Sequence, residues 1–113
     1  MRRRILVIGD DKTLVQTRVH ILNRRYTALG AVPRAALTWL ENAPFDAVVI
    51  CCSLSREDAA SVVGDVRNEF PSMPILALEL SYGHRAHLGA TATAETTEGP
   101  EVWMNALDGM LDQ

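Results

Sequence analysis

The stretch FDAVVICCSL, residues 45–54, holds the most continuous apolar run in this chain of 113 residues. From Ala47 to Cys52 the run carries no charge and no alternation of polar and apolar side chains. A strand with one face in water would alternate, whereas a short, β-branched, wholly apolar run is typical of a strand buried on both faces of a parallel sheet. We therefore expect this stretch to form the central strand of the fold.

Further strands and helices are predicted to alternate on both sides of this run. Asp10, Asp11 and Thr13 can each cap the first predicted helix, and Ser55 with Asp58 has the spacing of a capping box. Pro33 suits the first turn of a helix. Apolar runs predict strands over 4–9, 26–32, 74–80 and 89–94, and helical spacing of apolar residues predicts helices over 13–25, 33–42, 55–70 and from 100 onward.

This order of elements predicts one α/β domain, a three-layer α/β/α sandwich that spans residues 1–113. Helical crossovers join parallel strands, and five strands fit the flavodoxin-like order 2-1-3-4-5. The first and third strands are then neighbours. Their carboxyl ends are expected to bring Asp10 and Asp11 close to Cys51 and Cys52.

The composition is that of an ordinary globular chain, with 48% hydrophobic and 22% charged residues. No apolar run reaches the roughly 18 residues that a membrane span needs, so we expect no membrane insertion and a cytoplasmic location. A net charge of −3 argues against a nucleic-acid-binding surface. Two adjacent cysteines are not a disulfide framework.

Several segments resemble response-regulator receiver domains, and the resemblance covers almost the whole chain. The run ILVIGDD, residues 5–11, resembles the first strand of that family with its acidic cluster. The run DAVVI, residues 46–50, resembles the approach to the aspartate that accepts a phosphoryl group. Further likeness lies in Tyr26 with Ala31, Ala36 and Leu37, in the run PILAL at 74–78, and in Gly89-Ala90.

The same resemblance implies that most of the residues needed for phosphorylation are missing. Cys51 stands where the family has its acceptor aspartate, and Gly9 replaces the first of two acidic magnesium ligands. Asp10 remains as the second, with Asp11 beside it as a substitute. Glu79 takes the place of the switch hydroxyl, and Thr96 falls near the position of the lysine.

These changes predict a pseudo-receiver that lacks the phosphorylation switch, is not an enzyme and needs no cofactor. Magnesium prefers hard oxygen ligands, and a thiolate does not replace a carboxylate, so magnesium binding should be weak or absent. Glu79 would repel a phosphoryl group, and Thr96 carries no charge to attract one. The resemblance implies protein partners in a bacterial-type phosphorelay, whether the domain stands alone or belongs to a longer protein.

Two other chemistries remain open from the sequence. The chain could be a small flavodoxin-like redox or thiol-dependent enzyme that uses Cys51 at the carboxyl edge of the sheet. Adjacent strand residues point to opposite faces, so at most one cysteine should face the acidic pocket, whose carboxylates would raise its pKa. His84 and His87, with a cysteine and Asp10, could bind zinc, although histidines in a surface turn are commoner.

The segment after the fourth strand is short for a receiver domain. Residues 81–89 are interrupted by Gly83, so we expect a shortened fourth helix of a turn or two. This would leave part of the last helix uncovered. Trp103, Met104 and Met110 could then form a partner surface or a homodimer contact, but at helical spacing they could equally belong to the core.

Overall fold

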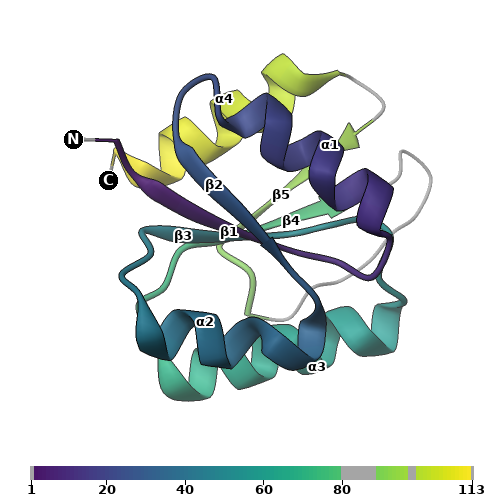
Figure 1. Ribbon diagram of the computed structural model, residues 1–113, viewed down its shortest axis with the longest axis vertical. Coiled ribbons are helices and arrows are strands. Elements are labelled where there is room, and N and C mark those ends of the chain that lie inside the picture. Colours follow the sequence, from purple (N-terminus) through teal and green to yellow (C-terminus); the bar gives the residue numbers. More distant parts are fainter. Residues whose placement is uncertain (1, 80–88, 97–98, 113) are drawn as a thin grey trace.

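The computed structural model describes residues 2–79, 89–96 and 99–112, and within them a five-stranded sheet of order β2-β1-β3-β4-β5 (Figure 1). Every neighbouring pair of strands is parallel. The predicted flavodoxin-like strand order is therefore confirmed. The strands are β1 (Arg4–Ile8), β2 (Thr27–Ala31), β3 (Ala47–Ile50), β4 (Ile75–Glu79) and β5 (Ala92–Glu95).

Helices cover both faces of the sheet, which confirms the three-layer sandwich. In Figure 1 α1 and α4 lie on one face, and α2 and α3 lie on the other. Each pair of helices buries its own apolar cluster against the sheet. The helices are α1 (Lys12–Leu22), α2 (Ala36–Asn42), α3 (Arg56–Glu69) and α4 (Pro100–Leu111), and a single 3-10 turn, η1 (Pro33–Ala35), precedes α2.

The central strand β3 is buried on both faces, as its apolar run predicted. Its four residues are at most 1% exposed. Ala47 and Val49 join the cluster under α1 and α4, whereas Val48 and Ile50 join the cluster under α2 and α3. The strand is shorter than the run, however, because the chain turns after Ile50 and the Leu54 N–H donates to the Cys51 carbonyl at 3.3 Å.

Two of the predicted helix caps are present. The Asp11 carboxylate accepts a hydrogen bond from the Leu14 N–H at 3.1 Å, and the Ser55 hydroxyl accepts one from the Asp58 N–H at 3.1 Å. The predicted end of α1 is wrong, because the helix stops at Leu22 rather than at 25. Arg25 lies in the following turn, where it forms ion pairs with Glu101 and Asp108 of α4.

Both ends of the described chain lie at the amino edge of the sheet. Figure 1 places the N-terminus and the C-terminus next to each other, and the Arg3 guanidinium donates to the carbonyl of Leu111 at 2.5 Å. No helix within the described ranges combines the length and apolar character needed to cross a membrane. The predicted fourth helix, His84 and His87 lie outside the described residues.

Candidate functional site at the carboxyl edge of the sheet

The carboxyl ends of β1 and β3 place Gly9 and Cys51 side by side. Ile8 and Ile50 are paired in register, and the Cys51 N–H donates to the Ile8 carbonyl at 2.8 Å. On the other side of β1, the Gly9 N–H donates to the Ala31 carbonyl at 3.1 Å. In a sheet of this order the edge outside β1 and β3 is the usual place for a ligand.

Gly9 leaves no room for a side chain at this edge. A Cβ atom added to Gly9 would lie 2.7 Å from Val15 Cγ2 and 2.8 Å from Cys51 Cβ, closer than real Cβ contacts. Val15 also covers Gly30, where an added Cβ would lie 2.6 Å from its Cγ1. The two glycines therefore let α1 pack directly onto the ends of β1 and β2.

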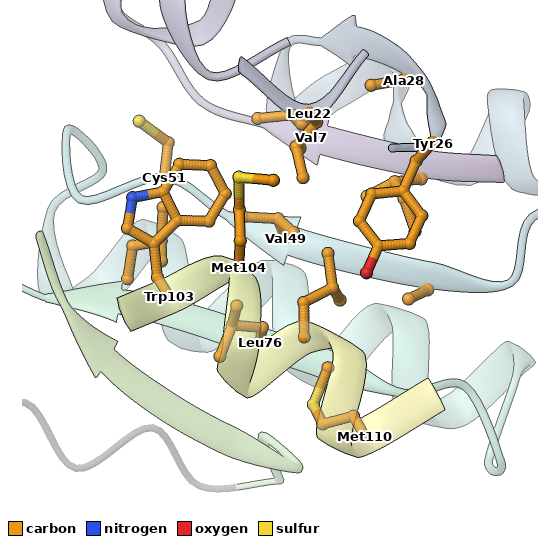
Figure 2. Close-up of a cluster of buried hydrophobic side chains, with 14 of the residues drawn as sticks. Val7, Leu22, Tyr26, Ala28, Val49, Cys51, Leu76, Trp103, Met104 and Met110 are labelled. Atoms are coloured by element: carbon orange, nitrogen blue, oxygen red, sulfur yellow. The ribbon is translucent and has the colours of Figure 1, made fainter. Parts of the chain in front are cut away.

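Both cysteines belong to the apolar cluster under α1 and α4. Cys51 is 1% exposed and shares this cluster with Val49, Trp103 and Met104 (Figure 2). Cys52 is 9% exposed. The two cysteines do not point to opposite faces, because β3 ends at Ile50 and the extended conformation needed for alternation ends with it. The prediction that at most one cysteine faces the acidic pocket holds, since only Cys52 lines it.

An open hollow lies over this edge, and Cys52 rather than Cys51 lines it. Asp10 and Asp11 are exposed on its rim, close to Cys52 as predicted, and Asp11 also caps α1. The hollow is lined by Asp10, Asp11, Lys12, Leu14, Cys52 and Ser53.

Arg18 of α1 reaches Cys52 from beneath the hollow. Its Nη2 donates to Cys52 Sγ at 4.0 Å, and its guanidinium lies 5.9 Å from the centre of the Trp103 ring. The sequence analysis missed Arg18, although its position gave a signal. It stands between Val15 and Leu22 in the apolar spacing of α1, where a charged side chain is unusual and calls for a partner inside the fold.

The pKa values of the two thiols are shifted in opposite directions. A hydrogen bond with Cys52, together with burial, raises the pKa of Cys51 far above its usual range. A hydrogen bond from Cys51 lowers the pKa of Cys52 to about 5, helped by Arg18 and the Thr96 hydroxyl and opposed by burial. The prediction that nearby carboxylates would raise the pKa is wrong for Cys52, and for Cys51 the cause is the neighbouring thiol rather than an acid.

Glu79 and Thr96 meet at the same edge, at the ends of β4 and β5. Thr96 Oγ1 donates to the Glu79 carbonyl at 3.2 Å. Glu79 ends β4, two residues beyond Ala77, which is the partner of Ile50 in the sheet. The structure thus gathers the residues that the sequence analysis assigned to the degenerate site: Gly9, Asp10, Asp11, Cys51, Glu79 and Thr96.

Solved structures with the same architecture cover nearly the whole chain. A putative response regulator from Chloroflexus aurantiacus has a TM-score of 0.87 at 20% identity and covers 100% of both chains. The chemotaxis response regulator CheY4 of Vibrio cholerae has a TM-score of 0.81 at 22% identity, over 97% of this chain and 99% of its own. The response regulator protein TrrA, solved in complex with the histidine kinase ThkA, has a TM-score of 0.80 at 17% identity, over 96% and 98% of the two chains.

The fold is that of response-regulator receiver domains. No protein-family model matches the sequence. No curated protein matches it either. The likeness to receiver domains therefore lies in the fold. At such low sequence identity, the role of each side chain at the carboxyl edge has to be inferred from its own contacts.

The three α4 residues that were predicted to form a partner surface are buried. Trp103 and Met104 are 1% and 2% exposed, and Met110 is 9% exposed. All three point into the cluster between α4, α1 and the sheet, as Figure 2 shows. The predicted interaction surface of these three side chains is therefore wrong, and the alternative, a place in the core, is confirmed. A homodimer through the last helix stays a prediction.

A pair of substitutions on α4 tests this assignment. Trp103→Ala should lower the free energy of unfolding by about 3–5 kcal/mol, the usual cost of truncating a buried aromatic side chain. Val102→Ala, at the exposed neighbouring position, should change it by about 0.5 kcal/mol or less. Denaturant unfolding of both variants provides the comparison. Equal stability of the two would contradict the core assignment.

A second pair of substitutions tests the tight packing at the carboxyl edge. Gly9→Ala should destabilise the domain by about 1–3 kcal/mol, because its Cβ must displace Val15 or Cys51. Gly64→Ala is the matched control, since Gly64 is exposed within α3 and an added Cβ has no neighbour within 4 Å. It should stabilise the domain by about 0.5–1 kcal/mol through helix propensity. Opposite shifts of the thermal midpoint are expected, and a neutral Gly9→Ala would contradict the packing argument.

Proposed function

We propose that this chain is a receiver-like signalling module of a bacterial-type two-component pathway that acts through protein contact without being phosphorylated. The observation that carries the proposal is the pairing of the five-stranded sheet of a receiver fold with an altered carboxyl edge. At that edge a buried thiol, Cys51, stands at the acceptor position, and Gly9 is packed too tightly to hold a carboxylate. The scaffold is thus retained while the chemistry is lost.

The residues present do not fit a magnesium ion, and we propose that none is bound during function. Magnesium needs several hard oxygen ligands in near-octahedral geometry. Position 9 offers no side-chain oxygen, position 51 offers sulfur, and the Asp11 carboxylate already accepts a helix N–H. Asp10 alone supplies too little negative charge to dehydrate the ion.

Protein partners follow from the receiver fold and from one of the similar structures. TrrA was solved in complex with the histidine kinase ThkA. We propose that this chain likewise contacts a histidine kinase or another protein of such a pathway in the cytoplasm. Since the proposed contact involves no phosphoryl transfer, its affinity should not depend on magnesium.

Phosphorylation assays test the first half of the proposal. Acetyl phosphate with magnesium should add no phosphoryl group by intact-mass measurement, and beryllofluoride with magnesium should leave the amide NMR spectrum unchanged. A receiver domain that has its acceptor aspartate, treated in parallel, should respond to both reagents. A stoichiometric adduct on this chain would overturn the proposal.

The variant Cys51→Asp tests whether the loss rests on one residue. It should remain unphosphorylated under the same conditions, because Gly9, Glu79 and Thr96 still provide no magnesium ligand, switch hydroxyl or lysine. Its fold is checked by circular dichroism, since a buried carboxylate next to Cys52 is costly. Phosphorylation of Cys51→Asp at the level of an ordinary receiver domain would show that the rest of the site is intact.

Binding measurements test the second half. The purified chain is titrated by calorimetry against the histidine kinases encoded by the same cell. At least one is expected to bind with the same affinity in magnesium and in a chelator. Failure of every kinase to bind, or binding only with magnesium and a phosphoryl donor, would contradict action by phosphate-independent contact.

A further inference from the structure

Cys52 and Arg18 form a pair of reactive and charged groups that the proposed receiver-like function does not use. Arg18 Nη2 lies 4.0 Å from Cys52 Sγ, and the guanidinium also lies over the ring of Trp103. Among the residues that the structure describes, no carboxylate lies within 4.0 Å of this guanidinium. The two ion pairs found among those residues are both formed by Arg25. Its Nε is buried and, in the same part of the chain, has no hydrogen-bond partner.

A half-buried cation without a carboxylate favours a negative charge next to it. Burial of an unpaired charge is costly, and an opposite charge within about 4–6 Å offsets that cost. The group in that position is the Cys52 sulfur, which becomes an anion when it loses its proton. The pKa of Cys52 is lowered, mainly by the hydrogen bond from Cys51 and further by Arg18, in agreement with this geometry.

Cys52 is also the cysteine that small molecules can reach. It lines the open hollow at the carboxyl edge, whereas Cys51 is 1% exposed. The charged groups that line the hollow are Asp10, Asp11 and Lys12, all exposed to solvent, so water screens their effect more than that of Arg18. One further acid, the half-buried Glu79, lies at the same edge at the end of β4. The neutral Thr96 hydroxyl is a further contact of Cys52.

We propose that Cys52 is a sulfenylation site, a thiolate held by Arg18 that reacts with hydroperoxides entering the hollow. The sulfur attacks the outer oxygen of the peroxide. An S–O bond forms, the O–O bond breaks, and hydroxide or alkoxide leaves and takes a proton from water. Cysteine is oxidised to a sulfenic acid, and the peroxide is reduced to water or an alcohol.

The neighbouring thiol does not readily convert this sulfenic acid to a disulfide. Adjacent Cα atoms lie about 3.8 Å apart across a trans peptide, closer than the roughly 4.4–6.8 Å of ordinary disulfides. The product at Cys52 therefore persists until an external thiol attacks it, forming a mixed disulfide and water.

Alkylation with iodoacetamide between pH 3 and pH 9 tests the thiolate. The rate at Cys52, followed by peptide mass spectrometry, should rise with a midpoint near pH 5, since its pKa is about 5. At pH 6 it should be several-fold faster than for free cysteine, because the larger thiolate fraction outweighs the lower intrinsic nucleophilicity of an acidic thiol. A midpoint at or above that of free cysteine would overturn the proposal.

Variants of Arg18 separate the role of its charge from that of its packing. Arg18→Gln should move the alkylation midpoint upward by about one pH unit or more, whereas Arg18→Lys should move it less. Arg34→Gln, at an exposed position near α2, is the matched control and should leave it unchanged. Circular dichroism confirms that each variant is folded, and an unchanged midpoint in folded Arg18→Gln would overturn the role of Arg18.

Peroxide treatment tests the modification itself. The native chain, exposed to hydrogen peroxide in the presence of dimedone, should gain one adduct on Cys52. Cys51→Ser should keep this adduct, and Cys52→Ser should lose it. An adduct on Cys51, an internal disulfide between the two cysteines, or no adduct at peroxide levels that modify free cysteine would each overturn the proposal. None of these results depends on phosphorylation or on a kinase partner.

Discussion

The close approach of α1 to the ends of β1 and β2 is the constraint on which the carboxyl edge depends. Val15 lies over Gly9 and Gly30, and a methyl group added to either glycine would collide with it. Protein interiors are packed densely enough that such a contact cannot be relaxed by a small shift. The same close packing places Cys51 next to Gly9 at the end of β1. It also positions Arg18, one turn after Val15 in α1, within contact of Cys52.

The contacts at this edge differ in kind from those that the proposed loss of phosphorylation alone would leave. Where a receiver domain needs several carboxylates around a cation, this chain has a cation of its own, the Arg18 guanidinium, and a thiol that can balance it. The local electrostatics differ from those of such a site, with the positive charge of Arg18 next to the sulfur, Asp10 and Asp11 exposed to solvent, and Glu79 half-buried at the end of β4. A metal ion and a phosphoryl group suit an acidic, oxygen-lined pocket, whereas this arrangement suits a soft anion.

The fold could be predicted from the sequence because burial leaves a clear pattern in it. Local preferences predicted three features that are present in the structure: the buried strand at 47–50, the helix caps at Asp11 and Ser55, and the alternation of strands and helices. The site was harder to predict because its details depend on tertiary contacts. The turn after Ile50 put both cysteines in one cluster, and the spacing of Trp103, Met104 and Met110 could not tell a core from a partner surface.

The adjacent chain ends, joined by the contact between Arg3 and Leu111, bear on how the domain can be connected to other molecules. Both ends leave from the amino edge, and the hollow with Cys52 opens at the opposite edge. A dye, a surface tether or a fused domain at either end would hold the hollow facing outward. A short linker between the ends would also allow circular permutation, with new ends cut into a surface loop and the order of the sheet preserved.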